Sequence, residues 1–157
     1  MPFFSVVIAT RNRPALFHTA LSSVLAQSYP DTEVIVVNDG SDAEHQRAYD
    51  AILDGSASAR VRRVTLLERP RGHGGAYATN AGADAAKGKY LCFLDDDDCW
   101  TDPGHLARVR TMVEAMECAP DLVITDQAAF LNGEPRPGPI WIEDLPKILA
   151  RSGKEPD

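Results

Sequence analysis

The sequence is poor in cysteine, and its cysteines show no pairing pattern. Of 157 residues only three are cysteines, Cys92, Cys99 and Cys118, and their number is odd. They lack the paired spacing that is typical of a zinc site, and they do not form a disulfide framework. We therefore expect free or buried thiols in a reducing compartment.

The sequence also lacks any long apolar run. No stretch reaches the roughly 20 residues that a membrane-spanning helix requires. The apolar segment 3–9 is too short for a signal peptide, and Arg11 and Arg13 follow it directly. We expect no membrane span and a cytoplasmic location.

The sequence has fewer basic than acidic residues, 16 Lys and Arg against 23 Asp and Glu, which gives a formal net charge of −7. This balance argues against a nucleic-acid partner, which usually leaves a basic footprint. Four arginines nevertheless lie close together in two segments and could form a local site for an anionic ligand: Arg11, Arg13, Arg69 and Arg71. The chain length is that of one domain.

Short apolar runs alternate with amphipathic stretches along the chain. Strands are predicted at residues 3–10, 33–37, 61–67 and 89–94. Helices are predicted from Pro14 to the break at Tyr29-Pro30-Asp31, at 43–53, at 76–86 and from Pro103 onward. The apolar stripes of the first and last helix are predicted at Leu16, Ala20, Leu21, Val24 and Leu25, and at Leu106, Val109, Met112, Val113 and Met116. This alternation predicts an α/β fold with a mostly parallel, doubly wound sheet flanked by helices.

The later part of the chain is less regular. We predict a fifth strand at residues 121–125, a hairpin turn at Asn132-Gly133 and a short helix at 142–151.

A polar cluster follows each of the four predicted strands, at residues 10–13, 38–42, 69–75 and 95–98. The carboxyl ends of parallel strands lie at one edge of the sheet, and ligands of open α/β sheets bind there. We therefore expect these four segments to converge on one site. This convergence carries more weight than any single motif.

Residues 95–98, the acidic run, are four consecutive aspartates after a predicted buried strand. Two carboxylates about 4 Å apart repel by roughly 4 kcal/mol at an effective dielectric near 20. A hard divalent cation such as Mg²⁺ or Mn²⁺, shared with phosphate oxygens, would offset that repulsion. A solvated acidic loop that caps the next helix is the alternative. An EF-hand is disfavoured because Cys99 stands at its fifth position and the required glycine is missing.

Two other turns allow a functional and a structural interpretation. Asp39 could accept hydrogen bonds from a nucleobase or ribose, or Asp39 or Ser41 could cap the next helix. Residues 72–75 could bring backbone close to phosphate, with Arg71 adding charge-assisted hydrogen bonds, or could be only a flexible connection. For the rings of His73 and Trp100, incidental placement and packing are the simpler interpretations.

Taken together, five segments resemble glycosyltransferase family 2, the large inverting family with the Rossmann-like GT-A fold: SVVIATRNRP (5–14), SVLAQSYP (23–30), EVIVVNDGSD (33–42), GGAYATNAG (74–82) and GKYLCFLDDDDCW (88–100). Their order and spacing are specific, and they span about the first 120 residues. The resemblance implies a nucleoside diphosphate sugar as donor, by family habit UDP-linked, bound with Mn²⁺ or Mg²⁺.

The resemblance also implies roles for individual residues. Thr10 and Asp39 match positions that hold the nucleotide base, and Arg11 and Arg71 belong to the same nucleotide-binding set. Asp95-Asp96-Asp97 matches the family's DXD motif. Asp96 is expected at the ribose, Asp97 as the main metal ligand, and Asp95 at the metal through water and beside the nucleotide. Thr79-Asn80 departs from the family's usual Arg-Asn, which leaves the phosphate and sugar contacts less defined.

The resemblance divides the chain into a donor-binding core, residues 1–130, and a loop with a short helix, residues 131–157, that starts an incomplete acceptor half. The general base of the family lies well past the metal motif, so we expect it beyond Asp157. The later carboxylates, none in a motif that can be matched, are Asp126, Glu134, Glu143 and Asp144.

Three functional hypotheses follow. The first is a transferase acting on a glycan, a lipid-linked sugar or a small molecule, with homo-oligomerisation left open. The second is a non-catalytic nucleotide-sugar-binding module. A nucleotidyltransferase ranks last, because the loop after the first strand contains no glycine.

Overall fold

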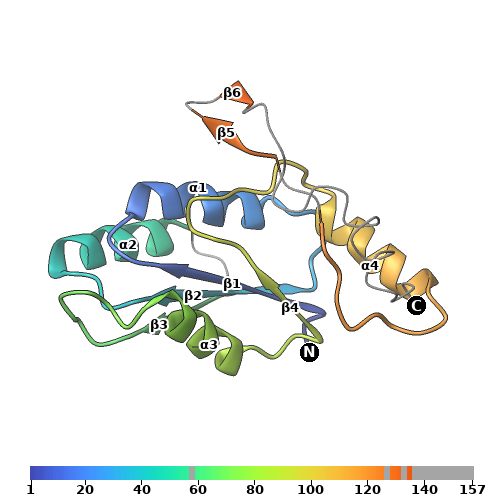
Figure 1. The fold of residues 1–157 in the computed structure, drawn as a ribbon, viewed down its shortest axis with the longest axis horizontal. Helices are drawn as coiled ribbons and strands as arrows, with labels where there is room; N and C mark the ends of the chain where they lie inside the picture. The colour runs from blue at the N-terminus through green and yellow to red at the C-terminus, as the bar shows by residue number, and fades with distance from the viewer. Residues whose placement is uncertain (57–58, 126–127, 132–133, 136–157) are drawn as a thin grey trace, which may run out of the picture. The chain divides into compact units, whose positions relative to one another are not determined.

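The computed structural model describes residues 1–56, 59–125, 128–131 and 134–135, which fall into two compact units, Met1–Glu117 and Cys118–Asp157. In the first unit, strands and helices alternate along the chain (Figure 1). The elements are β1 (Phe4–Thr10), α1 (Pro14–Leu25), β2 (Thr32–Asn38), α2 (Ala43–Ser56), β3 (Val61–Thr65), α3 (Gly75–Ala85), β4 (Tyr90–Phe93) and α4 (His105–Ala115).

The four strands form one parallel sheet in the order β3-β2-β1-β4. The two central strands β1 and β2 are almost entirely buried, which explains their continuous apolar sequence. At the carboxyl ends of these strands, Thr10 pairs with Asn38, and Asn38 pairs with Thr65. The sequence prediction of a parallel α/β sheet is therefore confirmed, and the carboxyl ends of the strands meet at one edge.

Helices cover both faces of the sheet (Figure 1). On one face Ala78 of α3 packs against Val7, Ile35 and Val37, while α1 and α2 lie on the other face. Gly82 lets α3 approach closely, because a Cβ there would lie 2.4 Å from Cγ1 of Val7. The alternation of side chains along each strand thus supplies two apolar layers from one sheet.

Three details of the sequence prediction for the first unit are wrong. In β4, Leu91 and Phe93 are exposed, because α3 packs on β1 and β2 and leaves that face of β4 uncovered. In α1, Leu16 is exposed, and Phe17 is buried together with the predicted Ala20, Leu21 and Val24. The helix ends at Leu25, before the predicted break at Tyr29-Pro30-Asp31.

The third error concerns the last helix of the unit. It begins at His105 rather than at Pro103, because Oδ1 of Asp102 accepts the N–H of Gly104 and closes a turn before the helix starts. Its buried residues are Leu106 and Val113, and Met112 and Met116 are exposed.

The second unit contains strands β5 (Phe130–Leu131) and β6 (Glu134–Pro135), which pair antiparallel. That pairing supports the predicted hairpin, although Asn132-Gly133 and the predicted helix 142–151 lie outside the described residues. The predicted strand 121–125 is wrong: these residues are irregular, and Leu122 and Ile124 are exposed. Among the described residues, no helix has the length and apolar character to cross a membrane.

Candidate functional site

The segments that follow β1, β2 and β4 meet at one edge of the sheet, the carboxyl edge. Side chains from these segments, from α2 and from the loop before α3 contact one another there. The contacts form two groups: one surrounds Asp96, and the other surrounds Asp39.

Asp96 is the centre of the first group and is only 1% exposed. Its Oδ2 accepts hydrogen bonds from Thr10 Oγ1 at 2.6 Å and from Arg13 Nε at 3.1 Å, and its Oδ1 accepts one from Arg13 Nη2. A buried carboxylate is costly unless it is paired and hydrogen-bonded. Thr10 and Arg13 together meet that requirement.

The hydroxyl of Tyr49 in α2 contacts both Thr10 and Arg13. Because the Thr10 hydroxyl donates to Asp96, its oxygen accepts the hydrogen bond from the Tyr49 hydroxyl, over 2.9 Å. The Tyr49 oxygen in turn accepts the backbone N–H of Arg13, at 2.8 Å. The result is a directional chain, Arg13 N–H to Tyr49 to Thr10 to Asp96, which positions three segments of the polypeptide.

The rest of the acidic run is solvent-exposed. Nη1 of Arg13 lies 3.0 Å from Oδ2 of Asp97, so one guanidinium bridges two neighbouring aspartates. Partial burial raises the pKa of the largely exposed Asp98 above its ordinary value, and the charges of Asp95 and Asp97 raise it further. The repulsion expected from the sequence is therefore present at this edge, and Arg13 offsets part of it.

Asp39 is the centre of the second group and is 6% exposed. Its Oδ1 accepts the backbone N–H of His73 at 2.7 Å, and its Oδ2 accepts that of Gly74 at 3.0 Å. Asp39 thus holds the loop before α3 against the end of β2. The loop is not simply a flexible connection, because a buried carboxylate anchors it.

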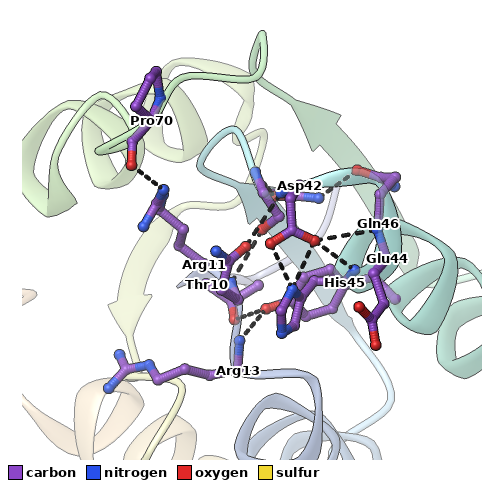
Figure 2. Close-up of polar contacts among 12 residues, drawn as sticks. Thr10, Arg11, Arg13, Asp42, Glu44, His45, Gln46 and Pro70 are labelled. Carbon is purple, nitrogen blue, oxygen red and sulfur yellow. Dashed lines mark hydrogen bonds and ion pairs between the residues drawn. The ribbon is translucent and has the colours of Figure 1, made fainter.

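The alternative that Asp39 or Ser41 caps the next helix is wrong. Asp42 does so, since its Oδ1 accepts the N–H groups of Glu44 and His45 (Figure 2). Ser41 accepts instead the N–H of Asn12. Asp39 and Ser41 instead make contacts between loops of the carboxyl edge.

Arg11 and Gly72 lie beside Asp39. Arg11 Nη2 donates to the carbonyl oxygens of Arg69 and Pro70, at 3.2 and 3.0 Å, and Figure 2 shows its side chain reaching Pro70. Its Nε is buried and has no hydrogen-bond partner. Gly72 has φ 68°, and a Cβ there would lie 2.6 Å from Oδ2 of Asp39 and 2.7 Å from Cδ of Arg11. Only glycine fits at this position.

The remaining residues of the predicted set are more loosely placed. Arg71 is exposed on the loop anchored by Asp39. The ring of His73 stacks on that of Tyr77, with centroids 5.2 Å apart, and its Nε2 lies 2.9 Å from the carbonyl oxygen of Leu67. Trp100 packs beside His105, which agrees with the packing interpretation.

The sequence did not identify two residues that the structure brings into the site. Arg13 was recognised only as one of four clustered arginines, and Tyr49 was one residue of a polar helix. The available signal for Tyr49 is its spacing to Leu53, because these are the two buried residues of α2. An aromatic hydroxyl on the buried stripe of a polar helix needs a hydrogen-bond partner, and here that partner is Thr10.

A divalent metal is compatible with the donors at this edge. Among the described residues, no group of three or more His, Cys, Asp or Glu side chains is arranged to hold an ion. Asp95 and Asp97, on either side of the buried Asp96 in the sequence, supply exposed carboxylate oxygens. Mg²⁺ is usually bound by one or two carboxylates together with substrate phosphates, and these two residues fit that pattern.

Comparisons with known proteins show which family this chain resembles. The chain is 30% identical over 156 residues to an uncharacterized glycosyltransferase of Nostoc sp., an alignment that covers 95% of this chain and 46% of the relative. The chain thus spans about half the length of that relative.

Two solved structures share the fold. One is a mannosyltransferase from Pyrobaculum calidifontis in complex with GDP-Man and Mn2+, with TM-score 0.64, 25% identity, and coverage of 74% of this chain and 33% of that chain. The other is TarS 1-349 of S. aureus in complex with UDP-GlcNAc, with TM-score 0.61, 23% identity, and coverage of 73% and 31%. The family model for glycosyl transferase family 2 matches residues 5–146. The chain therefore belongs to glycosyltransferase family 2 and has the GT-A fold.

Proposed function

We propose that this chain forms the donor-binding part of a glycosyltransferase that moves a sugar from a nucleoside diphosphate sugar to an acceptor, with a divalent metal at the diphosphate. The observation that carries the proposal is that Asp39 and the acidic run both lie at the carboxyl edge of a family 2 fold. One group suits a nucleoside and the other suits a metal-bound diphosphate.

The nucleoside end consists of Thr10, Arg11, Asp39 and Arg71. Each oxygen of Asp39 accepts one backbone N–H and keeps a second lone pair, which can accept from a base. The buried Nε of Arg11 is a donor that lacks an acceptor, and leaving such a group unpaired costs about 1–3 kcal/mol. A bound nucleotide oxygen would remove that cost.

The metal end consists of Asp95, Asp96 and Asp97. Asp97 and Asp95 are the exposed carboxylates, so they are the proposed ligands, Asp95 through water. Asp96 is buried under Thr10 and Arg13, and it can reach a ribose hydroxyl only when Arg13 releases it. The metal would neutralise charge on the departing diphosphate, and Arg71 would add charge-assisted hydrogen bonds to it.

The proposed reaction is an inverting displacement, in which a base deprotonates the acceptor hydroxyl as it attacks from the face opposite the diphosphate. We assign no base. Glu134 lies in β6 of the second unit, and Asp126, Glu143 and Asp144 lie outside the described residues.

The test is calorimetric titration of the 157-residue chain with UDP and with GDP, each with Mn²⁺ and with EDTA. We expect UDP to bind in the presence of Mn²⁺ and much more weakly in EDTA. Preference for GDP would correct the base, and metal-independent binding of both would contradict the metal. A hydrolysis assay on UDP-sugars then tests the alternative of a binding module, because turnover of the donor would contradict it.

A further inference from the structure

Arg13 makes contacts that neither the sequence motifs nor the proposed donor site assigns to it. Its guanidinium donates through Nε and Nη2 to the two oxygens of Asp96, and through Nη1 to Asp97 at 3.0 Å. All three guanidinium nitrogens are therefore engaged with the acidic run. The side chain is about half exposed, so it can leave this position without breaking the core.

The position of Arg13 coincides with the place of a metal ion in the proposed site. Asp97 is the proposed main metal ligand, and its Oδ2 accepts the hydrogen bond from Arg13. A guanidinium cannot lose its proton in a protein, so it remains a cation whenever it is near the metal. Arg13 and a divalent cation therefore compete for the same carboxylate and repel each other when both are close.

The backbone of Arg13 is fixed independently of its side chain. Its N–H donates to Tyr49, and its carbonyl oxygen accepts the N–H of Phe17 in the first turn of α1. A substitution at this position can therefore remove the charge while the backbone contacts that hold the loop remain.

We propose that Arg13 is a built-in counter-ion of the acidic run, which a divalent metal must displace from Asp97 and which the diphosphate of the donor then takes as a new partner. This inference rests on the proposed donor site and deepens it. Before the donor binds, Arg13 neutralises Asp96 and Asp97 and weakens binding of metal alone. With the donor present, a diphosphate offers the displaced guanidinium phosphate oxygens that it can bind bidentately. Arg13 thereby couples metal binding to donor binding.

The test measures binding of Mn²⁺ alone and of UDP with Mn²⁺ to the wild-type chain and to Arg13→Gln, by calorimetry and by the paramagnetic resonance signal of free Mn²⁺. Without nucleotide, we expect Arg13→Gln to bind Mn²⁺ about threefold to tenfold more tightly than wild type. With Mn²⁺ saturating, we expect it to bind UDP about threefold to tenfold more weakly. A purely structural role for Arg13 predicts no gain in metal affinity.

Arg63→Gln is the matched control, because Arg63 also bridges two aspartates, Asp50 at 3.6 Å and Asp54, and lies outside the site. It should leave both affinities unchanged. Arg13→Lys keeps the charge, so its Mn²⁺ affinity should lie closer to wild type. If Arg13→Gln does not fold, as judged by thermal unfolding, the comparison of Arg13→Lys with wild type still decides, since weaker ion pairing should raise Mn²⁺ affinity.

Two results would overturn the inference. Equal or weaker Mn²⁺ binding by a folded Arg13→Gln chain, while wild type binds UDP with Mn²⁺, overturns the counter-ion role alone. Failure of wild type and all variants to bind Mn²⁺ with or without UDP overturns the metal in the proposed function and the counter-ion role with it.

Discussion

The two edges of the central sheet both hold a buried carboxylate, yet they use it differently. At the amino edge, Glu33 of β2 accepts hydrogen bonds from Ser5 Oγ and from the N–H of Lys87, both at 2.6 Å. Ser5 Oγ accepts the N–H of Gly88 at 2.7 Å, and Arg62 lies 3.5 Å from Oε2 of Glu33. This network joins β1, β2, β3 and the segment between α3 and β4 through contacts within the chain.

At the carboxyl edge, charged groups are left with capacity for a ligand. Arg11 has an unpartnered Nε, Asp97 is half exposed, and the single guanidinium of Arg13 serves two aspartates. Buried polar groups that are satisfied internally rigidify a fold, whereas incompletely satisfied ones mark places where a ligand completes the arrangement. A buried carboxylate thus holds strands together at the amino edge, whereas the carboxylates at the carboxyl edge belong to the proposed donor site.

The largest effect is expected for Asp97→Asn at the carboxyl edge. Loss of the proposed metal ligand should weaken Mn²⁺-dependent UDP binding on the order of 100-fold, by analogy with disruption of metal-supporting groups. Stability should change by less than about 1 kcal/mol, because the ion pair with Arg13 is half exposed. Asp54→Asn, which removes an exposed partner of Arg63, is the control in calorimetry and urea unfolding. Unchanged UDP affinity in Asp97→Asn would show that the acidic run is only a solvated loop.

Glu33→Gln at the amino edge should lower stability and leave donor binding almost unchanged. It replaces charge-assisted hydrogen bonds in a buried network, so we expect a loss of about 1.5–3 kcal/mol in the free energy of unfolding at pH 7. The affinity for UDP with Mn²⁺ should stay within twofold of wild type, roughly the error of such a comparison. If Glu33→Gln lost affinity for UDP at unchanged stability, Glu33 would act in binding, and the two edges would not differ as described.

The effect of Glu33 also depends on pH. Burial raises the pKa of Glu33, but the hydrogen bonds from Ser5 and Lys87 and the charge of Arg62 outweigh it, so the pKa lies below its usual 4.5. The unfolded chain then binds the proton more readily, and stability from this group is present above pH 4.5 and lost as the pH falls through the folded pKa. Urea unfolding from pH 7 to pH 3 should show the wild-type advantage over Glu33→Gln shrinking below pH 4.5.

Two glycines provide a matched pair of smaller changes. Gly72→Ala places a Cβ against Asp39 and Arg11 at a residue with positive φ, and Gly88→Ala places one 2.6 Å from the backbone N of Ser5. Each should cost about 1–3 kcal/mol of stability through overpacking. Only Gly72→Ala should also weaken UDP binding, as measured by calorimetry below the unfolding temperature of both variants. Equal losses of affinity in the two variants would mean that binding simply follows stability.

The sequence predicted the parallel sheet and the four loops at its carboxyl edge, because continuous apolar runs and the polar turns after them are local signals. It did not predict that Leu91 and Phe93 are exposed, because that depends on which strands α3 covers. The partner of Asp39 in the loop before α3 is 34 residues away along the chain, and Arg13 reaches Asp96 across 83 residues. Local pattern cannot supply such pairings. The roles of Thr10, Asp39, Asp95 and Asp97 at the donor stay predictions.

Tyr49→Phe is the smallest change that tests the difference between the two edges, because it removes one oxygen and keeps the ring. The ring packs edge-on against Phe17 of α1, with centroids 5.3 Å apart, so the substitution preserves this contact between α1 and α2. The lost hydroxyl leaves the N–H of Arg13 without its acceptor and frees the hydroxyl of Thr10 to turn away from Asp96. We expect a stability loss of about 1 kcal/mol and a UDP affinity lower by about threefold to tenfold.

Tyr29→Phe is the control, because Tyr29 lies among the rings of Phe3 and Phe4 at the amino edge. It should leave UDP affinity unchanged. A positioning role also predicts that Tyr49→Phe changes the Mn²⁺ affinity of the nucleotide-free chain, since Arg13 is then held less firmly over Asp97. If Tyr49→Phe lowers stability but changes neither the UDP nor the Mn²⁺ affinity, the hydroxyl supports only the fold. Tyr49 would then be a structural residue, as Glu33 is at the amino edge.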